Sequence, residues 1–263
     1  MKRIAVFWHI YIPRQPHRSF EIINRQFELL KSSGLIDVST IYVGVVGSLE
    51  SDTLKKILSH QNVVLCSHAT NGYESVTTHE LWKFCKNATD DYFVLYFHSR
   101  GSSYTRKLWR KKVVNGDKWT LAMEALVIRQ WKVVLEYMGK NKSWTSGCEL
   151  WNKKHSDGFP LEGFHYVGNF WWALPSFIRK LPDPVVCSKI HRGTKLERFV
   201  CGEFWLHLNW DNTTRNKHFI LHYTGREEYK HGLNLPYNFK YDEKYYSCSD
   251  KMLPQLLSRT PCR

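Results

Sequence analysis

The stretch Asp90-Asp91-Tyr92-Phe93-Val94-Leu95-Tyr96-Phe97-His98-Ser99-Arg100-Gly101 decides the fold of this chain. After two acids, expected at the start of a strand, comes an uncharged run of β-branched and aromatic residues. Such a run is typical of a strand buried on both faces. It ends in small polar residues that favour a turn. Ligands of open α/β sheets bind at the carboxyl ends of strands. We therefore expect His98, Ser99 and Arg100 at a ligand-binding site. The alternative is that they form a solvated polar loop.

Strand and helix patterns alternate along the first hundred residues. Uncharged runs predict strands, and apolar residues at helical spacing predict the helices between them. The predicted strands are residues 4–8, 38–46, 62–66 and the opening stretch, and the predicted helices are 20–35, 54–58 and 76–85. This alternation predicts the α/β class, with a mostly parallel central sheet flanked by helices.

The rest of the chain has fewer clear elements. We predict a long helix that begins at 116–119 and ends at Gly139, a strand at 143–150, a helix at 196–210 with Glu203 in its middle, and a last strand at 219–223. No repeat or linker is visible, so a single domain of residues 1–263 is expected. Residues 226–263 are polar and rich in Tyr and Lys, and we expect them to wrap the domain as a tail.

The composition favours a folded, basic protein. Of 263 residues, 43% are hydrophobic and 15% aromatic, which suffices for a packed core and argues against a disordered chain. The formal net charge of +14 predicts attraction to nucleic acid, an anionic membrane surface or phosphorylated small molecules. The densest basic cluster is residues 106–112, for which the alternative is a solvated face.

The cysteines and the N-terminal residues indicate the cellular compartment of the protein. The seven cysteines are odd in number and lack Cys-x-x-Cys spacing, which indicates reduced thiols of an intracellular protein. Residues 1–9 lead into a strand without the apolar core and cleavage site of a signal peptide. No apolar run is long enough to span a bilayer. We therefore expect a cytoplasmic protein that contacts a membrane surface at most.

The order of these motifs resembles the nucleotide-sugar-binding half of glycosyltransferases with the GT-A fold. Strand one ends in Trp8-His9, and a polar turn at 68–74 precedes the helix that leads to the fourth strand. In that family the fourth strand usually ends in Asp-x-Asp, which holds a divalent cation on the donor diphosphate. This chain has His98-Ser99-Arg100 instead. An arginine can neutralise a diphosphate directly through bidentate hydrogen bonds.

A closer resemblance is to bacterial and giant-virus glycosyltransferases related to the rhamnan-synthesis F type. Residues 93–101 look like their strand followed by His-Thr-Lys-Gly, and residues 165–173 contain their Gly-Asn-Phe-Trp-Trp run. Gly202-Glu203-Phe204-Trp205 is similar to their Glu that is followed closely by Trp. The resemblance covers about residues 4–210 and implies a viral or bacterial enzyme of glycan or polysaccharide biosynthesis.

The resemblance implies a nucleotide-sugar-dependent transferase. It would move a hexosyl or deoxyhexosyl group from a nucleotide-diphosphate-sugar donor to a hydroxyl of a glycan, glycoprotein or glycolipid. Residues 1–101 would form the donor half, and 102–225 the acceptor and catalytic half. We expect the donor to be bound by Trp8, His9, Asn71, Glu74, His98, Ser99, Arg100, His222 and Arg226.

Two carboxylates are candidates for the general base. Glu203 lies among aromatic residues in the sequence, and burial would raise the pKa of its carboxyl group toward the range useful for taking a proton. Asp157, in a Ser-Asp-Gly loop, is the second candidate. The alternative for Glu203 is a solvent-facing or structurally paired carboxylate.

The Gly168-Asn169 pair and the tryptophans after it form the candidate sugar-binding run. The pair permits a tight turn, and the amide can bind sugar hydroxyls. Trp171 and Trp172 should point in different directions, so at most one would stack on a sugar ring in a given cleft. The alternative is that both tryptophans belong to the core.

The departure from Asp-x-Asp bears on cofactors. No obligatory metal is predicted, because Arg100 would replace its charge; if Mn²⁺ or Mg²⁺ is used, the candidate ligands are His98, Asp91 and His222. The rival hypothesis is a non-catalytic nucleic-acid-binding protein, with residues 104–112 lining a single-strand channel. No recognisable nucleic-acid module is present, so specific nucleic-acid binding is not expected.

Overall fold

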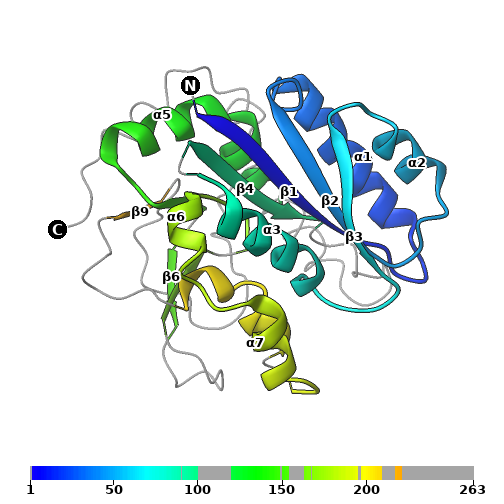
Figure 1. The fold of residues 1–263 in the computed structure, drawn as a ribbon. Coiled ribbons are helices and arrows are strands. Elements are labelled where there is room, and N and C mark those ends of the chain that lie inside the picture. Colours follow the sequence, from blue (N-terminus) through cyan, green and yellow to red (C-terminus); the bar gives the residue numbers. More distant parts are fainter. Residues whose placement is uncertain are drawn as a thin grey trace, which may run out of the picture.

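The structure is a computed structural model that describes residues 2–89, 91–99, 120–148, 150–153, 163–166, 168–194, 197–208 and 217–220. Its first half alternates strand and helix, as the sequence predicts (Figure 1). The elements are β1 (Arg3–Tyr11), α1 (His17–Ser32), β2 (Ser39–Val46), α2 (Asp52–Leu58), β3 (Val63–Ala69), α3 (Ser75–Asn87) and β4 (Tyr92–His98).

The second half has shorter elements. They are a π-helical segment (Glu124–Arg129), α5 (Trp131–Asn141), β5 (Thr145–Gly147), β6 (Leu150–Lys153), β7 (Gly163–Tyr166), β8 (Trp171–Ala173), α6 (Pro175–Ile178), α7 (Pro184–Ile190), α8 (Glu197–Val200), a 3₁₀ turn (Trp205–His207) and β9 (His218–Ile220). The predicted tail and the basic cluster lie outside the described residues.

The described strands form one large sheet in the order β3-β2-β1-β4-β8-β5-β9, and β6 pairs with β7 in a separate hairpin. Strands β3, β2, β1 and β4 run parallel to one another, as do β5 and β9. Only β8 is antiparallel to the strands beside it in this sheet. Helices flank the sheet, so the predicted α/β class with a mostly parallel sheet is confirmed.

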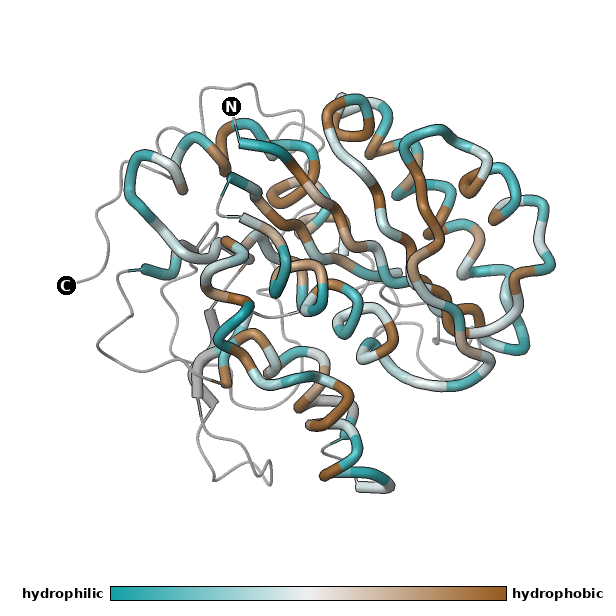
Figure 2. The backbone as a smooth tube through the Cα atoms, in the orientation of Figure 1, coloured by the Kyte–Doolittle hydropathy of each residue, from teal (hydrophilic) through white to brown (hydrophobic). Residues whose placement is uncertain are grey.

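The central strands are buried on both faces of the sheet. Neighbouring side chains of a strand point to opposite faces, so each strand contributes to two cores. In β1, Val6 and Trp8 belong to the core beneath α1, whereas Ala5 and Phe7 belong to the core beneath α3. Hydrophobic and hydrophilic residues alternate along α1 and α2, as expected of helices with one face on a sheet (Figure 2). Each fully buried aliphatic or Phe side chain contributes about 1.5–3 kcal/mol.

Three sequence predictions for the second half are wrong in detail. The long helix is interrupted by the π-helical segment and a break at Gln130, and it continues through Gly139 to Asn141. Lys142, not Gly139, ends the helix, and it adopts the left-handed conformation with φ +50°. The strand at 143–150 is divided between β5 and β6, and the helix at 196–210 is only a short α8 followed by turns.

Two further expectations concern cysteines and membrane spans. Among the described cysteines, Cys85, Cys148, Cys187 and Cys201 are buried and Cys66 is partly exposed. Within the described part of the chain, every helix is too short or too polar to cross a bilayer.

Candidate functional site

The carboxyl ends of β1 and β4 place two histidines side by side. His9 and His98 are direct neighbours in the parallel register. Both side chains lie on the face that α3 covers, because His9 contacts Thr77 of α3 and His98 approaches Glu74, the residue before α3. These residues come from three elements far apart in sequence, so the strand ends and the beginning of α3 converge as the motif analysis expected.

Glu74 lies at the centre of this group. Its Oε2 accepts hydrogen bonds from the Tyr96 hydroxyl, at 2.8 Å, and from the Asn169 side-chain amide. Its Oε1 lies 3.7 Å from His98 Nδ1. Burial alone would raise the pKa of Glu74, but His98, His9 and the two hydrogen bonds outweigh burial and hold the pKa below its ordinary value. The group is therefore an ionised carboxylate whose Oε2 accepts two hydrogen bonds from the protein and whose Oε1 faces His98.

The Gly168-Asn169 turn is attached to this carboxylate. Both residues have positive φ, +85° and +58°, which glycine and asparagine tolerate better than other residues. The Gly168 carbonyl accepts a hydrogen bond from His98 Nε2 at 2.9 Å, and Asn169 Oδ1 accepts one from Trp171 Nε1 at 2.7 Å. The predicted tight turn is present. Asn169 is buried, however, and its amide group bonds the protein, so in this structure it has no open face toward a sugar hydroxyl.

His9 is buried and contributes to packing. Its Nδ1 lies 2.8 Å from the Thr77 hydroxyl. Gly44 of β2 allows α3 to come this close, since a Cβ at position 44 would lie 2.0 Å from Thr77 Oγ1. Burial, partly offset by Glu74 and reinforced by His98, lowers the pKa of His9 to about 4. The ring is therefore neutral near pH 7 and cannot offer a positive charge to a diphosphate.

The low pKa of His9 predicts loss of stability in mild acid. The unfolded chain binds a proton at His9 near pH 6.5 and the folded chain only near pH 4, so the folded state should lose up to about 3 kcal/mol as the pH falls from 6.5 to 4. Urea denaturation across this range measures how the free energy of unfolding changes with pH. His9→Gln should reduce this pH dependence. Buried His207, whose pKa burial also lowers, and Glu74, whose pKa is held below its ordinary value, contribute to the pH dependence that remains. A pH dependence equal to that of the parent would contradict the assignment.

Trp8 and Ser99 do not face this group. Trp8 points to the α1 side of the sheet, is fully buried, and donates from Nε1 to Gln26 Oε1 at 2.9 Å. The Ser99 hydroxyl accepts from the Tyr11 backbone N–H at 2.9 Å, and the Ser99 N–H donates to the His9 carbonyl. The expectation that Trp8 frames a nucleotide is wrong, because alternation along β1 turns it into the core. Ser99 instead fixes the end of β4.

A buried polar network behind β4 was missed by the sequence analysis. Gln26 Nε2 donates to Glu124 Oε1 at 2.9 Å and to the His98 carbonyl at 3.1 Å. Arg25 closes the network with two bonds to Glu124, at 2.9 and 3.0 Å. Glu124 belongs to the π-helical segment, a geometry found often near functional sites. The network holds the end of β4 from the opposite face. In the sequence, only the polar residue Gln26 within the apolar face of α1 indicates this network.

The exposed part of this sheet edge carries other side chains. Asn71 is exposed in the loop before α3, as a donor-binding residue would be. Tyr11 at the end of β1 and Tyr73 beside Glu74 are 36% and 44% exposed. A Cβ at Gly72, where φ is +149°, would lie 4.0 Å from Val46, which pairs with Tyr11 in the sheet. Neither tyrosine was singled out from the sequence, although large aromatic residues next to a predicted strand end were visible there.

The structure separates Asp91 from His98. Asp91 precedes β4, as expected, and Arg3 donates to its Oδ2 from Nε at 2.9 Å and Nη2 at 2.8 Å. Seven strand residues at about 3.3 Å each lie between it and the carboxyl end of β4. A metal set that combines Asp91 with His98 is therefore wrong. Within the described ranges, no three His, Cys, Asp or Glu side chains are grouped to hold a metal ion.

Glu203 lies in a turn between α8 and the 3₁₀ turn, where a helix was predicted. Its neighbour Cys201 contacts the first turn of α3, because the Thr78 hydroxyl donates to the Cys201 carbonyl at 3.4 Å. The segment that carries Glu203 therefore packs against the helix that begins at Glu74. Four other predicted site residues lie outside the described ranges: Arg100, Asp157, His222 and Arg226.

Trp171 and Trp172 point to opposite faces of β8, as predicted, and both are buried. Trp171 is 1% exposed and stacks on Tyr96 at 5.1 Å between ring centroids. Trp172 is 0% exposed and donates to the Val127 carbonyl at 2.8 Å. Neither indole presents an open face for a sugar, so the structure agrees with the alternative that both are core residues.

Comparison with known proteins gives a family. The family described as a domain of unknown function, DUF8361, matches residues 7–231. The chain belongs to this family. The DUF8361 match spans His9, Glu74, His98 and Glu203. No curated protein matches the chain. Among solved structures, 4-diphosphocytidyl-2C-methyl-D-erythritol synthase from Anaerococcus prevotii is similar at 12% identity and a TM-score of 0.36, over 75% of this chain and 83% of that chain.

Proposed function

We propose that this protein is a glycosyltransferase that takes a sugar from a nucleotide-diphosphate-sugar donor and transfers it to a hydroxyl of a glycan or glycoconjugate. The observation that carries the proposal is the convergence at the carboxyl ends of β1 and β4, where His98, Glu74 and the Gly168-Asn169 turn form one bonded group. This is the sheet edge at which open α/β sheets bind ligands. The two motifs of the resemblance meet there.

The bonded group would serve as the rigid floor of the donor site. Its polar atoms bind one another, so we assign direct donor contacts to residues around it. Asn71, Tyr11 and Tyr73 are exposed at this edge. Arg100 follows Ser99, whose backbone and hydroxyl bonds fix the end of β4. We propose that Arg100 neutralises the diphosphate, with His222 and Arg226 as further candidates, and that no metal ion is obligatory.

Glu203 is the proposed general base. The turn that carries it packs on the beginning of α3 through the contact of Cys201 with Thr78, and this contact supports the proposal. Taking the proton of the acceptor hydroxyl would need the carboxylate within hydrogen-bond reach of that oxygen once the acceptor is bound. Asp157 remains the second candidate.

The test is a panel of nucleotide sugars assayed for release of nucleoside diphosphate, with and without excess chelator. We expect one donor to be turned over in the presence of chelator. Arg100→Ala should weaken donor binding, and Glu203→Gln should lower transfer about 100-fold while donor affinity is retained, since a general base contributes about 10²–10⁴-fold. Arg192→Ala, at an exposed arginine after α7, is the matched control.

Each of these measurements has an outcome that would contradict part of the proposal. Loss of activity on chelation that Mn²⁺ restores would contradict the metal-free proposal but leave glycosyl transfer standing. Near-parental turnover of Glu203→Gln would move the base to Asp157. Salt-sensitive oligonucleotide binding, without turnover of any donor or stabilisation by any nucleoside diphosphate, would instead favour the nucleic-acid-binding hypothesis.

A further inference from the structure

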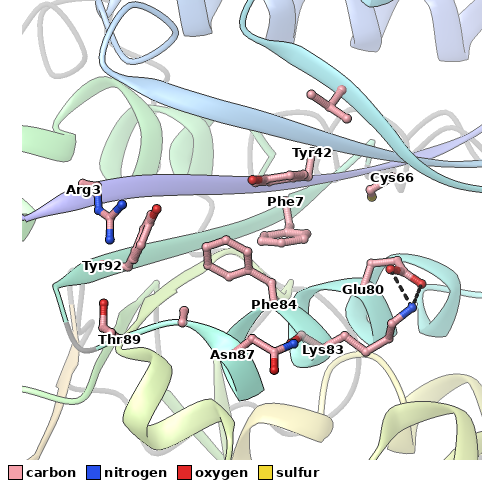
Figure 3. A pocket seen from close by; sticks show the side chains of 12 residues that line it. Arg3, Phe7, Tyr42, Cys66, Glu80, Lys83, Phe84, Asn87, Thr89 and Tyr92 are labelled. Carbon is pink, nitrogen blue, oxygen red and sulfur yellow. Dashed lines mark hydrogen bonds and ion pairs between the residues drawn. The ribbon is translucent and has the colours of Figure 1, made fainter.

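A groove of about 640 Å³ lies on the α3 face of the sheet, away from the candidate site (Figure 3). Arg3 and Tyr92, at the amino ends of β1 and β4, mark one end of it. The groove is lined by Arg3, Phe7, Tyr42, Val64, Cys66 and Tyr92 from the strands, and by Glu80, Lys83, Phe84 and residues 87–89 from α3 and the loop after it. The volume is within the range of small-molecule sites.

Four aromatic rings surround the groove. Phe7 stacks on Tyr42 with 4.8 Å between ring centroids. Phe84 meets the rings of Phe7 and Tyr92 edge-on, at 5.6 and 5.2 Å. Figure 3 shows Phe84 reaching from α3 toward the rings of the strands. Of the four, only Phe7 is fully buried. The groove therefore offers apolar ring surface that solvent reaches.

The charges of the groove are already balanced. Lys83 Nζ lies 2.9 Å from Glu80 Oε1, and Arg3 Nη2 lies 2.8 Å from Asp91 Oδ2. A phosphate or carboxylate ligand would have to displace one of these acids. Although the whole chain carries a formal charge of +14, this groove favours a neutral ligand.

Polar atoms in the groove argue against a purely apolar ligand. The Tyr42 hydroxyl forms no hydrogen bond with any described residue, and burial raises its pKa, so it keeps its proton and can donate. The Asn87 amide nitrogen donates to the Lys83 carbonyl, which leaves the amide oxygen for a ligand. Covering these groups with hydrocarbon would desolvate them without replacement bonds.

We propose that this groove binds a neutral oligosaccharide, separately from the candidate active site. Pyranose rings combine the two properties that the groove selects: a C–H face that packs on aromatic rings, and hydroxyls that accept from Tyr42 and donate to Asn87. The inference rests on the groove alone and does not require glycosyl transfer.

Ligand-observed NMR and titration with maltotriose, cellotriose and β-1,4-mannotriose test the proposal. At least one should bind the full chain. Tyr42→Phe removes only the hydroxyl and Asn87→Ala removes an exposed amide; each should weaken binding about five-fold, the weight of one net hydrogen bond. Phe84→Ala should abolish binding. Tyr137→Phe, which removes a hydroxyl from α5 outside the groove, should leave affinity unchanged.

Several results would overturn the proposal. Binding of none of the three saccharides, equal affinity in the parent and Tyr42→Phe, or binding of 1-octanol in place of sugar would each do so. A nucleoside diphosphate that competes with the saccharide would also contradict a separate site. Failure of all donors in the transfer assay would leave this proposal untouched, because its readout is saccharide affinity alone.

Discussion

Replacing Trp172 by Ala should lower the free energy of unfolding by about 4 kcal/mol, since truncating a buried Trp typically costs about 3–5 kcal/mol. The indole is fully buried in the core beneath α1, so its removal leaves a large cavity. The Val127 carbonyl also loses its partner in the π-helical segment. Urea denaturation monitored by far-UV circular dichroism measures the change.

The control for this prediction is an exposed aromatic residue. Tyr73→Ala should change stability by less than about 0.5 kcal/mol, because surface substitutions away from special features have small effects. A loss below about 1 kcal/mol in Trp172→Ala would contradict the packing described for β8. Trp172 would then again be a candidate for stacking on a sugar.

The first half of the fold could be predicted because its signals are local. A strand buried on both faces carries no charge over several residues, and the helices between such strands repeat apolar residues at helical spacing. The boundaries were less accurate. β1 continues past Trp8 to Tyr11, since its polar residue His9 is buried against Thr77, a contact 68 residues away.

The candidate site was predicted only in outline. That β4 ends in polar residues is visible in the sequence, but what they bind is not. Asn169 and Glu74 are 95 residues apart, and their bond depends on β8 pairing beside β4. The sequence therefore suggested ligand contacts for side chains that bind one another. The alternation rule did separate Trp171 from Trp172, but it did not show that both faces of β8 are covered.

The Glu203 segment shows how a helical pattern fails. Apolar and aromatic residues from Val200 to Leu206 suit a helix, yet α8 ends at Val200 and Gly202 follows two residues later. Glycine disfavours helix interiors by about 1 kcal/mol relative to alanine. The contact of Cys201 with α3 then favours a turn, which no local pattern indicates.

Replacing Glu74 by Ala should lower the free energy of unfolding by about 3–5 kcal/mol, the usual cost of removing one partner from a buried charged network. The Tyr96 hydroxyl and the Asn169 amide would lose their common acceptor. Asn169 would also lose a restraint on its positive φ, so the turn before β8 should loosen. Urea denaturation at pH 7 measures the loss.

A matched control lies on α3, the helix that Glu74 precedes. Glu80 forms an exposed pair with Lys83, so Glu80→Ala should cost less than about 1 kcal/mol. Tyr96→Phe removes one donor of the network. Combined with Glu74→Ala it should cost about 1 kcal/mol less than the sum of the single changes, because both remove the same hydrogen bond.

The result for Glu74 decides between two roles for the whole group. A carboxylate held mainly for ligand binding is under strain or partly unsatisfied without its ligand, and its removal commonly leaves stability unchanged or increases it. A carboxylate that holds the structure together gives the large loss and the coupling to Tyr96. Because Tyr96 and Asn169 both donate to Oε2 of this carboxylate, we expect the second outcome. A Glu74→Ala protein as stable as the parent would make Glu74 itself a ligand-binding group, and the donor would then contact the centre of the network in addition to its rim.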